Sequence, residues 1–392
     1  MEEWKECKLG DVLNFRRGHD LPHSKMKNGN VPVAGSNGII GYHDEATPIS
    51  PCITIGRSGN VGTPYIYEQC WAHNTVLYVD DFKNNYPLYL YYLLKTLPLS
   101  SFGGGSAVPT LNRNHIHPLI IKHTPNINTQ KKIASILKSL DDKIEVNRRI
   151  NENLEQQAQA LFKSWFVDFE PFKDQPFVES ELGMIPQGWK VGTFLDNINV
   201  MPGGTPSTSI DEYWKDGNIP FFCPKDANGV YCFDTEKKIT EEGLKKCSSH
   251  LYPKDTLFIT ARGTVGKLAL AGVPMAMNQS NYALVAKGSI GSFYLYLLTQ
   301  SLVSILMKKA NGAVFSAITT RDFNEPTLMP PTYILNKFET IVTPLFYKIH
   351  QVVKESRHLA ELRDTLLPRL MSGELRVTDV DLVNKLTENN IL

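Results

Sequence analysis

The spacing of hydrophobic residues predicts one long amphipathic helix near the middle of the chain. Between Thr129 and Phe169 there is no glycine or proline, and apolar side chains recur at alternating steps of three and four residues. The apolar positions are Ile133, Leu137, Leu140, Ile144, Leu154, Leu161 and Trp165. Two positions of the same stripe are polar, Asn147 and Asn151, and such residues fix helix register at a cost in stability. A helix of this length spans roughly 60 Å, so we expect it to connect separate parts of the molecule.

The chain contains an internal repeat. The segment Ile53–Gly62 resembles Leu257–Gly266, and Leu88–Leu94 resembles Phe293–Thr299, each about 205 residues later. Moving the apolar stripe forward by the same distance gives a second stripe: Phe338, Val342, Leu345, Ile349, Val352, Ser356, Leu359, Arg363, Leu366 and Leu370. Pro344 lies early in this second helix and is expected to kink it or to mark a false start. The nearest partner of each stripe is the other one, so we expect the two helices to pack antiparallel.

These patterns divide the chain into six segments. Residues 1–128 and 190–331 hold short β-like runs among Gly- and Pro-rich stretches, which is typical of small α+β domains. Residues 129–169 and 332–377 are the long helices, 170–189 is a Pro-rich linker and 378–392 is a polar tail. The predicted fold class is α+β, with two globular α+β domains separated by two long antiparallel coiled-coil helices in a pseudo-twofold internal repeat. The second domain has about twenty extra residues, which we place within 227–250, and one divergent region on a shared scaffold predicts two readers of different ligands.

Composition narrows the class of protein. The 392 residues include 42% hydrophobic side chains, and no apolar run approaches the length of a membrane span. The polar start does not resemble a signal peptide, and six cysteines without a CxxC pair predict a reduced cytoplasmic chain with free thiols and no metal site. A net charge of +1 does not indicate a nucleic-acid binder, so a DNA-binding face would require gathered basic residues or charge from a partner.

Two glycine-containing turns are the strongest candidates for ligand binding. Gly56–Gly62 and Arg262–Lys267 each follow a predicted strand. Glycine lets the backbone approach a phosphate, and arginine or lysine neutralises it. Two tight turns at equivalent repeat positions explain the same residues without a ligand. The second turn is not a nucleotide P-loop, because Ala261 stands where that motif requires glycine and no serine or threonine follows Lys267.

Motifs for catalysis are otherwise absent from the sequence. Phe102–Ser106 nearly matches the FxGxG loop of adenosylmethionine-dependent methyltransferases, but the accompanying tetrad of Asn or Asp, two prolines and an aromatic residue is missing. No paired carboxylates at convincing spacing and no GxSxG, Walker A or nuclease motif occur. At the end of the first helix, the aromatic residues Trp165, Phe166 and Phe169 have two readings, core packing or docking of a partner protein, since one opposing helix does not cover the stripe and this cluster together.

Several of these segments together resemble the specificity subunits of type I restriction–modification enzymes. The residues that carry the resemblance are Trp4-Lys5 with Leu9-Gly10-Asp11, the first helix ending LFKSWFVDFEPF, the linker ESELGMIPQGW and the second helix ending LLPRLMSGELRV. The resemblance covers nearly the whole chain, including its two-copy layout. The helix ends and the linker are its specific signals.

The resemblance implies a non-catalytic DNA-recognition subunit. Each globular domain is expected to be a target recognition domain that reads one half of a split, asymmetric sequence in double-stranded DNA. The helices are expected to set the gap between the halves and to dock the modification (methyltransferase) subunits, of which two are expected. Adenosylmethionine binds the modification subunits, while ATP use and DNA cleavage belong to the restriction subunits. For the chain itself we therefore expect no cofactor, no metal, no membrane and a cytoplasmic location.

Candidate residues follow from the chemistry of base readout, in which Arg, Asn, Gln and Lys carry the code. The expected DNA contacts are Arg57, Ser58 and Asn60, their counterparts Arg262, Thr264 and Lys267, and a further set of Asn112, Arg113 and Arg321. The expected partner-docking surface comprises Leu161, Trp165, Phe166 and Phe169. Two alternatives remain open at this point: a self-contained methyltransferase or nuclease, and a coiled-coil scaffold with two protein-binding domains.

Overall fold

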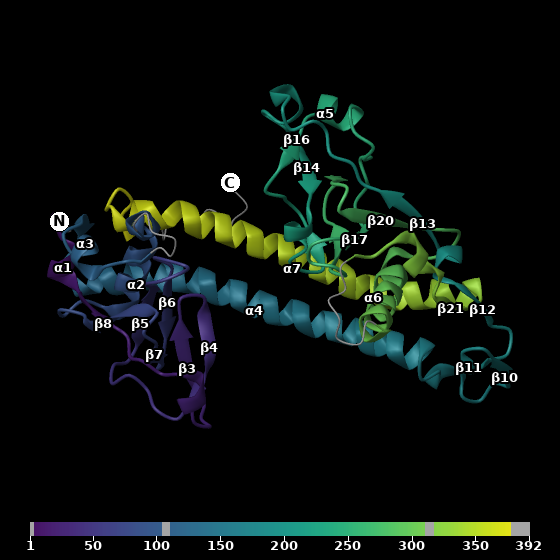
Figure 1. Cartoon of the computed structure of the whole chain (residues 1–392), viewed down its shortest axis with the longest axis horizontal. Coiled ribbons are helices and arrows are strands. Elements are labelled where there is room, and N and C mark those ends of the chain that lie inside the picture. The colour runs from purple at the N-terminus through teal and green to yellow at the C-terminus, as the bar shows by residue number, and fades with distance from the viewer. Residues whose placement is uncertain (1–3, 104–109, 310–316, 378–392) are drawn as a thin grey trace. The chain divides into compact units, whose positions relative to one another are not determined.

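The computed structural model describes residues 4–103, 110–309 and 317–377. The predicted tail and most of the Gly-rich stretch from Phe102 lie outside the described residues. The chain forms two compact units, the first made of Met1–Ile144 with His358–Leu392 and the second of Glu145–Arg357 (Figure 1). Their boundaries fall inside the two long helices, so each unit contains a part of both helices.

Among the residues that the structure describes, the first unit contains three small sheets. A four-stranded antiparallel sheet has the order β2 (Asn14–Arg17), β8 (Val76–Asp81), β5 (Cys52–Gly56), β6 (Pro64–Tyr67). In a three-stranded sheet, β3 (Val31–Gly35) pairs antiparallel with β4 (Gly38–His43) and parallel with β7 (Trp71–Ala72). The ends of the domain are joined by β1 (Lys5–Lys8) and β9 (Ile120–His123). The helical elements are α1 (Leu9–Val12), η1 (His23–Lys25), α2 (Pro87–Lys95), η2 (Leu99–Phe102) and α3 (Arg113–Ile116).

The second unit repeats this strand order and adds to it. Its large sheet has the order β13 (Ile198–Pro202), β20 (Asn281–Ala286), β17 (Leu257–Thr260), β18 (Leu268–Ala271), β15 (Tyr231–Cys232). In its three-stranded sheet, β14 (Ile219–Phe222) pairs antiparallel with β16 (Lys238–Ile239) and parallel with β19 (Ala276–Met277). The domain ends are joined by β12 (Lys190–Thr193) and β21 (Pro326–Met329). The helical elements are η4 (Phe194–Asp196), η5 (Asp211–Tyr213), η6 (Pro224–Asp226), α5 (Glu241–Lys245), α6 (Ser292–Lys309) and η7 (Thr320–Asn324).

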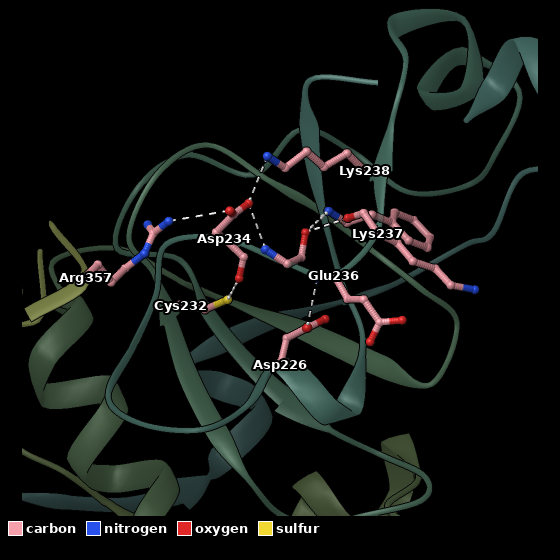
Figure 2. Close-up of polar contacts among 9 residues, drawn as sticks. Asp226, Cys232, Asp234, Glu236, Lys237, Lys238 and Arg357 are labelled. Carbon is pink, nitrogen blue, oxygen red and sulfur yellow. Dashed lines mark hydrogen bonds and ion pairs between the residues drawn. The ribbon is translucent and has the colours of Figure 1, made fainter. Parts of the chain in front are cut away.

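The fifth strand of the second unit lies in the region where the sequence predicted extra residues. Strand β15 adds to the sheet edge by pairing parallel with β18, and its Tyr231 side chain faces the second long helix. The His350 ring lies 5.0 Å from Tyr231 and 4.7 Å from Phe233 between ring centroids. Figure 2 shows Asp234 between Lys238 at 3.2 Å and Arg357 at 3.5 Å. The inserted strand and the residues that follow it therefore connect the large sheet of the second unit to the second long helix.

The long helices are α4 (Ile127–Phe166) and α7 (Thr332–Met371), each of 40 residues. Before α4, the side-chain oxygen of Asn126 accepts from the backbone N–H groups of Asn128 (3.0 Å) and Thr129 (3.2 Å), which satisfies amides that an α-helix leaves unpaired. Helix α7 begins at Thr332, well before Pro344, so Pro344 does not mark a false start. Proline removes a backbone donor but does not end this helix, whose apolar stripe is buried on both sides of Pro344 at Val342 and Phe346.

The two helices run antiparallel within each unit. In the first unit, Asp141 of α4 pairs with Arg363 of α7 at 2.6 Å, and Leu137 and Leu370 share one core cluster. In the second unit, Asn147 donates from Nδ2 to Glu355 at 2.9 Å, and the rings of Phe162 and Phe338 lie 6.2 Å apart. Along the pair, residue numbers therefore increase on α4 while they decrease on α7, as antiparallel packing requires. Asn147 is fully buried and its Oδ1 has no hydrogen-bond partner. A polar residue in the apolar stripe between two helices favours a single register of the helices.

Each globular domain is anchored to α4 by a tyrosine and a carboxylate. In the first unit, Tyr92 of α2 donates to Asp141 at 2.8 Å. In the second unit, Tyr296 of α6 donates to Glu155 at 2.9 Å. Burial and the adjacent carboxylate raise the pKa of both phenols, so both remain hydrogen-bond donors. These contacts fix the orientation of each domain on the long helix that it covers.

The predicted linker 170–189 carries structure of its own in the second unit. It holds η3 (Glu170–Phe172) and a hairpin of β10 (Phe177–Ser180) and β11 (Gly183–Pro186). Phe172, Ile185 and Trp189 are buried in the main core cluster of this unit. A Pro-rich stretch without periodicity therefore folds against the end of α4, because its few large apolar side chains find a common core there.

Candidate nucleic-acid interface

The two glycine-containing turns have the same backbone conformation in both units. Gly59 and Gly62 have φ values of 83° and 83°, and Gly263 and Gly266 have 82° and 83°. Each turn is closed by the same hydrogen bond, from Gly62 to Gly56 at 2.9 Å and from Gly266 to Thr260 at 2.8 Å. These values of φ lie in the left-handed region that favours glycine. The glycines therefore shape the turns, which is the reading that requires no ligand, and the side chains between them are left free to differ.

The strand register corrects the pairing of residues between the two turns. The backbone N–H groups of Arg57 and Ser58 both point to the carbonyl of Thr75, and those of Ala261 and Arg262 both point to the carbonyl of Ser280. Arg262 is therefore the counterpart of Ser58, and Ala261 is the counterpart of Arg57. The predicted equivalence of Arg57 and Arg262 is wrong by one residue, because the repeat distance is one residue shorter at the turns (Gly62 to Gly266) than after them (Thr75 to Ser280).

Gly62 and Gly59 form a matched pair for testing the turn. A Cβ at Gly62 would lie 2.6 Å from the Ser100 backbone nitrogen, whereas a Cβ at Gly59 would meet nothing within 4 Å. We expect Gly59→Ala to cost about 1 kcal/mol of unfolding free energy through backbone strain alone, and Gly62→Ala to cost about 2–4 kcal/mol because a steric clash is added. Urea denaturation of both variants measures the difference, and equal losses would contradict the packing described here.

The turn of the first unit is tied to two other segments. The Ser36 hydroxyl, at the tip of the β3–β4 hairpin, donates to the carbonyls of Ser58 at 2.5 Å and Thr75 at 3.0 Å. The Leu111 N–H donates to the Arg57 carbonyl at 2.7 Å. The hairpin tip, the turn and the segment that begins at Thr110 thus form one connected surface.

An arginine-lined hollow of about 380 Å³ opens on this surface. Its lining residues are Arg16, Arg17, Arg57, Leu77, Thr110, Leu111, Asn112 and Arg113. Burial and the neighbouring Arg17 lower the pKa of the Arg57 guanidinium below its ordinary value. The structure therefore brings together three of the predicted residues, Arg57, Asn112 and Arg113, and adds Arg16 and Arg17. Asn60 is exposed at the turn and does not line the hollow.

Local contacts hold the members of this hollow in place. Arg113 donates from Nη1 to the Phe15 carbonyl at 3.1 Å, and Asn112 caps α3 by accepting from the Asn114 N–H at 3.0 Å. His117 accepts from the Phe15 N–H at 3.1 Å through Nε2. Burial and the adjacent Arg113 lower the pKa of His117, which keeps this nitrogen an acceptor. His117 is therefore a structural residue of the first unit.

The candidate residues of the second unit do not gather in one hollow. Arg262 and Thr264 are exposed on the turn, where the Thr264 hydroxyl donates to the Pro224 carbonyl at 3.4 Å. Lys267 lines a different hollow of about 560 Å³, between the turn, α4 and α6, together with Glu155, Lys163 and Gln300. Arg321 lies exposed in η7 and does not line that hollow.

Comparison with known proteins now decides the family. The model of the type I restriction modification DNA specificity domain matches residues 1–156 and 186–343. The chain belongs to the type I restriction–modification specificity subunits. It is 34% identical to the Type I restriction enzyme MjaIX specificity subunit of Methanocaldococcus jannaschii over 74% of this chain and 70% of that one. It is 25% identical to the Type I restriction enzyme HindI specificity subunit of Haemophilus influenzae over 96% of this chain and 100% of that one.

A solved specificity subunit supports the fold. The crystal structure of a type I restriction–modification system S subunit from M. genitalium matches with a TM-score of 0.59 and 17% sequence identity, over 94% of this chain and 96% of that chain. At this identity the likeness concerns the fold alone. The mixed α/β content and the two specificity domains expected from the resemblance to this family are thereby confirmed.

The structure of our chain corrects the prediction that the aromatic cluster at the end of α4 is exposed. Trp165 and Phe166 are 8% and 5% exposed and belong to the core of the second unit. The Phe166 ring lies 4.8 Å from Phe338, 5.0 Å from Tyr294 and 5.8 Å from Trp189. Leu161 and Phe169 are half-buried beside them. The cluster is covered by the globular domain and the 170–189 segment, which the periodicity of α4 alone does not reveal.

Neither a metal cluster nor a membrane span is found among the residues that the structure describes. No group of three or more His, Cys, Asp or Glu side chains is placed to hold a metal ion in this part of the chain. None of its helices has both the length and the apolar character needed to cross a bilayer. The methyltransferase-like loop at Phe102–Ser106 falls partly outside the described residues.

Sequence reasoning missed Arg16 and Arg17 of the hollow. They end β2, whose register sets Arg16 opposite Tyr78 and Arg17 opposite Leu77 of β8. Strand β8 also pairs with β5, which leads into the Arg57 turn. The only signal in the sequence was an arginine doublet at the end of a β-like run, and pairing of distant strands is needed to place it beside Arg57.

Proposed function

We propose that this chain is the non-catalytic DNA-recognition subunit of a type I restriction–modification complex. In this proposal the globular domain of each unit is a target recognition domain that reads one half of a bipartite, asymmetric site in double-stranded DNA. Helices α4 and α7 form the antiparallel spacer of a pseudo-twofold molecule and set the gap between the half-sites. Modification subunits, two per complex, and restriction subunits supply methyl transfer, ATP use and cleavage in the cytoplasm.

The observation that carries the proposal is one turn presented twice with different side chains. The two turns share their glycine conformations and closing hydrogen bonds, whereas Arg57, Ser58 and Asn60 of the first are replaced by Ala261, Arg262 and Thr264 in the second. A constant backbone with changed donors and acceptors is what two readers of different base sequences require. The proposed base contacts remain Arg57, Ser58 and Asn60 of the first turn and Arg262 and Thr264 of the second, together with Asn112, Arg113, Lys267 and Arg321.

The proposed docking surface for the modification subunits moves to the outward faces of the long helices. In the second unit, Val146 on α4 is 49% exposed, and Tyr333 and Tyr347 on α7 are 66% and 60% exposed. Large apolar side chains on solvent-facing helix positions favour a protein partner. Trp165 and Phe166 are buried and leave the proposed surface, and Leu161 and Phe169 are half-buried beside them.

The test is the DNA motif methylated by the chain together with its modification subunits. Methylation-sensitive sequencing is expected to give one bipartite motif with two different half-sites and a fixed gap. Replacing residues 1–128 by the corresponding domain of another specificity subunit is expected to change one half-site and leave the other unchanged. A single continuous motif would overturn the two-reader assignment, methylation by the isolated chain would support a self-contained enzyme, and no sequence preference would support a scaffold.

A further inference from the structure

The arginine-lined hollow of the first unit gathers positive charge without acidic residues to balance it. Four of its eight lining residues are arginines, and none of the eight is an aspartate or glutamate. Arg16, Arg17 and Arg113 are exposed, and Arg57 is half-buried. Like charges brought together repel one another, and the repulsion grows as water is excluded. Such an arrangement is relieved when an anion binds between the guanidinium groups.

The arginines extend from backbone elements whose position does not need the anion. Arg16 and Arg17 extend from the paired strand β2, and Arg113 is fixed by its bond to the Phe15 carbonyl at 3.1 Å. Arg57 sits on the turn that is closed by the Gly62–Gly56 hydrogen bond. A preformed set of arginines matches the oxygens of phosphate groups, because guanidinium donates in a planar fork that phosphate accepts.

A second hollow of about 680 Å³ continues from the first across Arg16 and Arg17. It is also lined by Gly18, His19, Asp20, Trp71 and Asn74. Its one carboxylate, Asp20, already accepts a hydrogen bond from the Asn74 amide. Arg16 and Arg17 therefore line both hollows. The two hollows together form an extended groove.

The second unit has no equivalent of this arginine doublet. In the first unit Arg16 and Arg17 stand opposite Tyr78 and Leu77, and in the second unit Met201 and Pro202 stand opposite Ala283 and Tyr282. These are corresponding positions of the sheet order that both units share. The charge at this site is thus a property of the first unit alone.

We propose that Arg16 and Arg17 bind phosphate groups of the DNA backbone beside the half-site that the first unit reads, while Arg57 on the turn faces the bases. This assignment rests on the proposed function and adds a division of labour to it. Phosphate contacts position a protein on the duplex and supply affinity without sequence information. The first unit then contributes more of the salt-dependent affinity than the second unit.

The experiment compares variants of the chain assembled with its modification subunits. Binding to a duplex that carries the methylated motif, and to an unrelated duplex, is measured between about 50 and 200 mM salt. The double variant Arg16→Gln with Arg17→Gln is expected to weaken binding to both duplexes alike and to lower the slope of log K against log salt by about 0.9 for each phosphate that the variant no longer neutralises. The methylated motif is expected to stay the same.

Two controls separate charge from structure. Lysine at both positions keeps the charge and is expected to retain most of the slope. Met201→Gln, at the matching position of the second unit, is expected to leave the slope unchanged. A change in the first half-site caused by the glutamine variant would show that the doublet reads bases, and unchanged affinity and slope would show that the hollow does not contact DNA.

The proposed function and this assignment fail in different ways. If the wild-type complex methylates no bipartite motif, the proposed function is overturned. The slope on the unrelated duplex still reports on Arg16 and Arg17, because phosphate binding does not depend on sequence. If the motif is bipartite and the variants behave like wild type, only the assignment of the doublet is overturned.

Discussion

Replacing Phe166 with alanine is expected to lower the free energy of unfolding of the second unit by about 4 kcal/mol. Its side chain is 5% exposed and lies among Phe338, Tyr294 and Trp189 at ring distances of 4.8, 5.0 and 5.8 Å. Truncation removes the transfer free energy of the ring and leaves a cavity between rigid aromatic groups that cannot close around it. Aromatic pairs in this geometry add to the loss beyond their buried area.

The adjacent residue supplies the control. Val167 is 54% exposed, so Val167→Ala is expected to change the unfolding free energy by no more than about 0.5 kcal/mol. Chemical denaturation followed by tryptophan fluorescence includes the signal of the second unit, because Trp165 and Trp189 lie in the same cluster as Phe166. A loss below about 1 kcal/mol for Phe166→Ala, together with failure to bind the modification subunits, would instead make this residue part of a docking surface.

The aromatic cluster shows what a helical pattern predicts and what it does not. The stripe of α4 marked Ile133 and Leu137, and both are buried on one face of the helix, whereas Trp165, which was expected on a docking surface, is buried as well. Burial of Phe166 depends on Tyr294 in α6, Trp189 after the hairpin and Phe338 in α7. These partners come from three distant segments, so the periodicity of α4 alone does not predict the burial of Phe166.

The candidate DNA-binding residues show a similar division. The glycine pattern identified both turns, since positive φ values restrict the residue type at Gly59, Gly62, Gly263 and Gly266. The aligned segments Ile53–Gly62 and Leu257–Gly266 already set Ser58 opposite Arg262, and the strand register confirms this pairing, whereas the pairing of Arg57 with Arg262 used a repeat distance that is one residue too long for the turns. The pairing of β2 with β8 and of β8 with β5 places Arg16 near Arg57. This pairing joins segments that are distant in the sequence, so local patterns do not predict it.

Lengthening both long helices by one heptad is expected to widen the gap between the two methylated half-sites. The insertions belong between Ile144 and Glu145 in α4 and between Arg357 and His358 in α7, where the two units meet along the chain. Seven residues add about 10 Å of helix at about 1.5 Å per residue. They turn the helix by almost two full turns, with a deviation of about 20°. The apolar stripes therefore stay in phase with each other.

The size of the change follows from the geometry of the duplex. At about 3.4 Å per base pair along one strand, an added 10 Å corresponds to a gap longer by up to about three base pairs. A smaller increase is expected where the helices are inclined to the duplex axis. Sequencing the motif methylated by the lengthened complex measures the gap directly, and both half-site sequences are expected to stay the same.

Two further insertions separate spacing from general damage. Seven residues in α4 alone shift one part of its stripe relative to α7, so that the Asp141–Arg363 pair of the first unit and the Asn147–Glu355 pair of the second cannot both form between continuous helices, and methylation is expected to be abolished. Five residues in both helices add about 7.5 Å but rotate the helices by about 140°, which is expected to abolish methylation of any single motif. A heptad variant that remains active on the original gap would mean that α4 and α7 do not set the spacing. The spacing of the half-sites would then be set by the modification subunits.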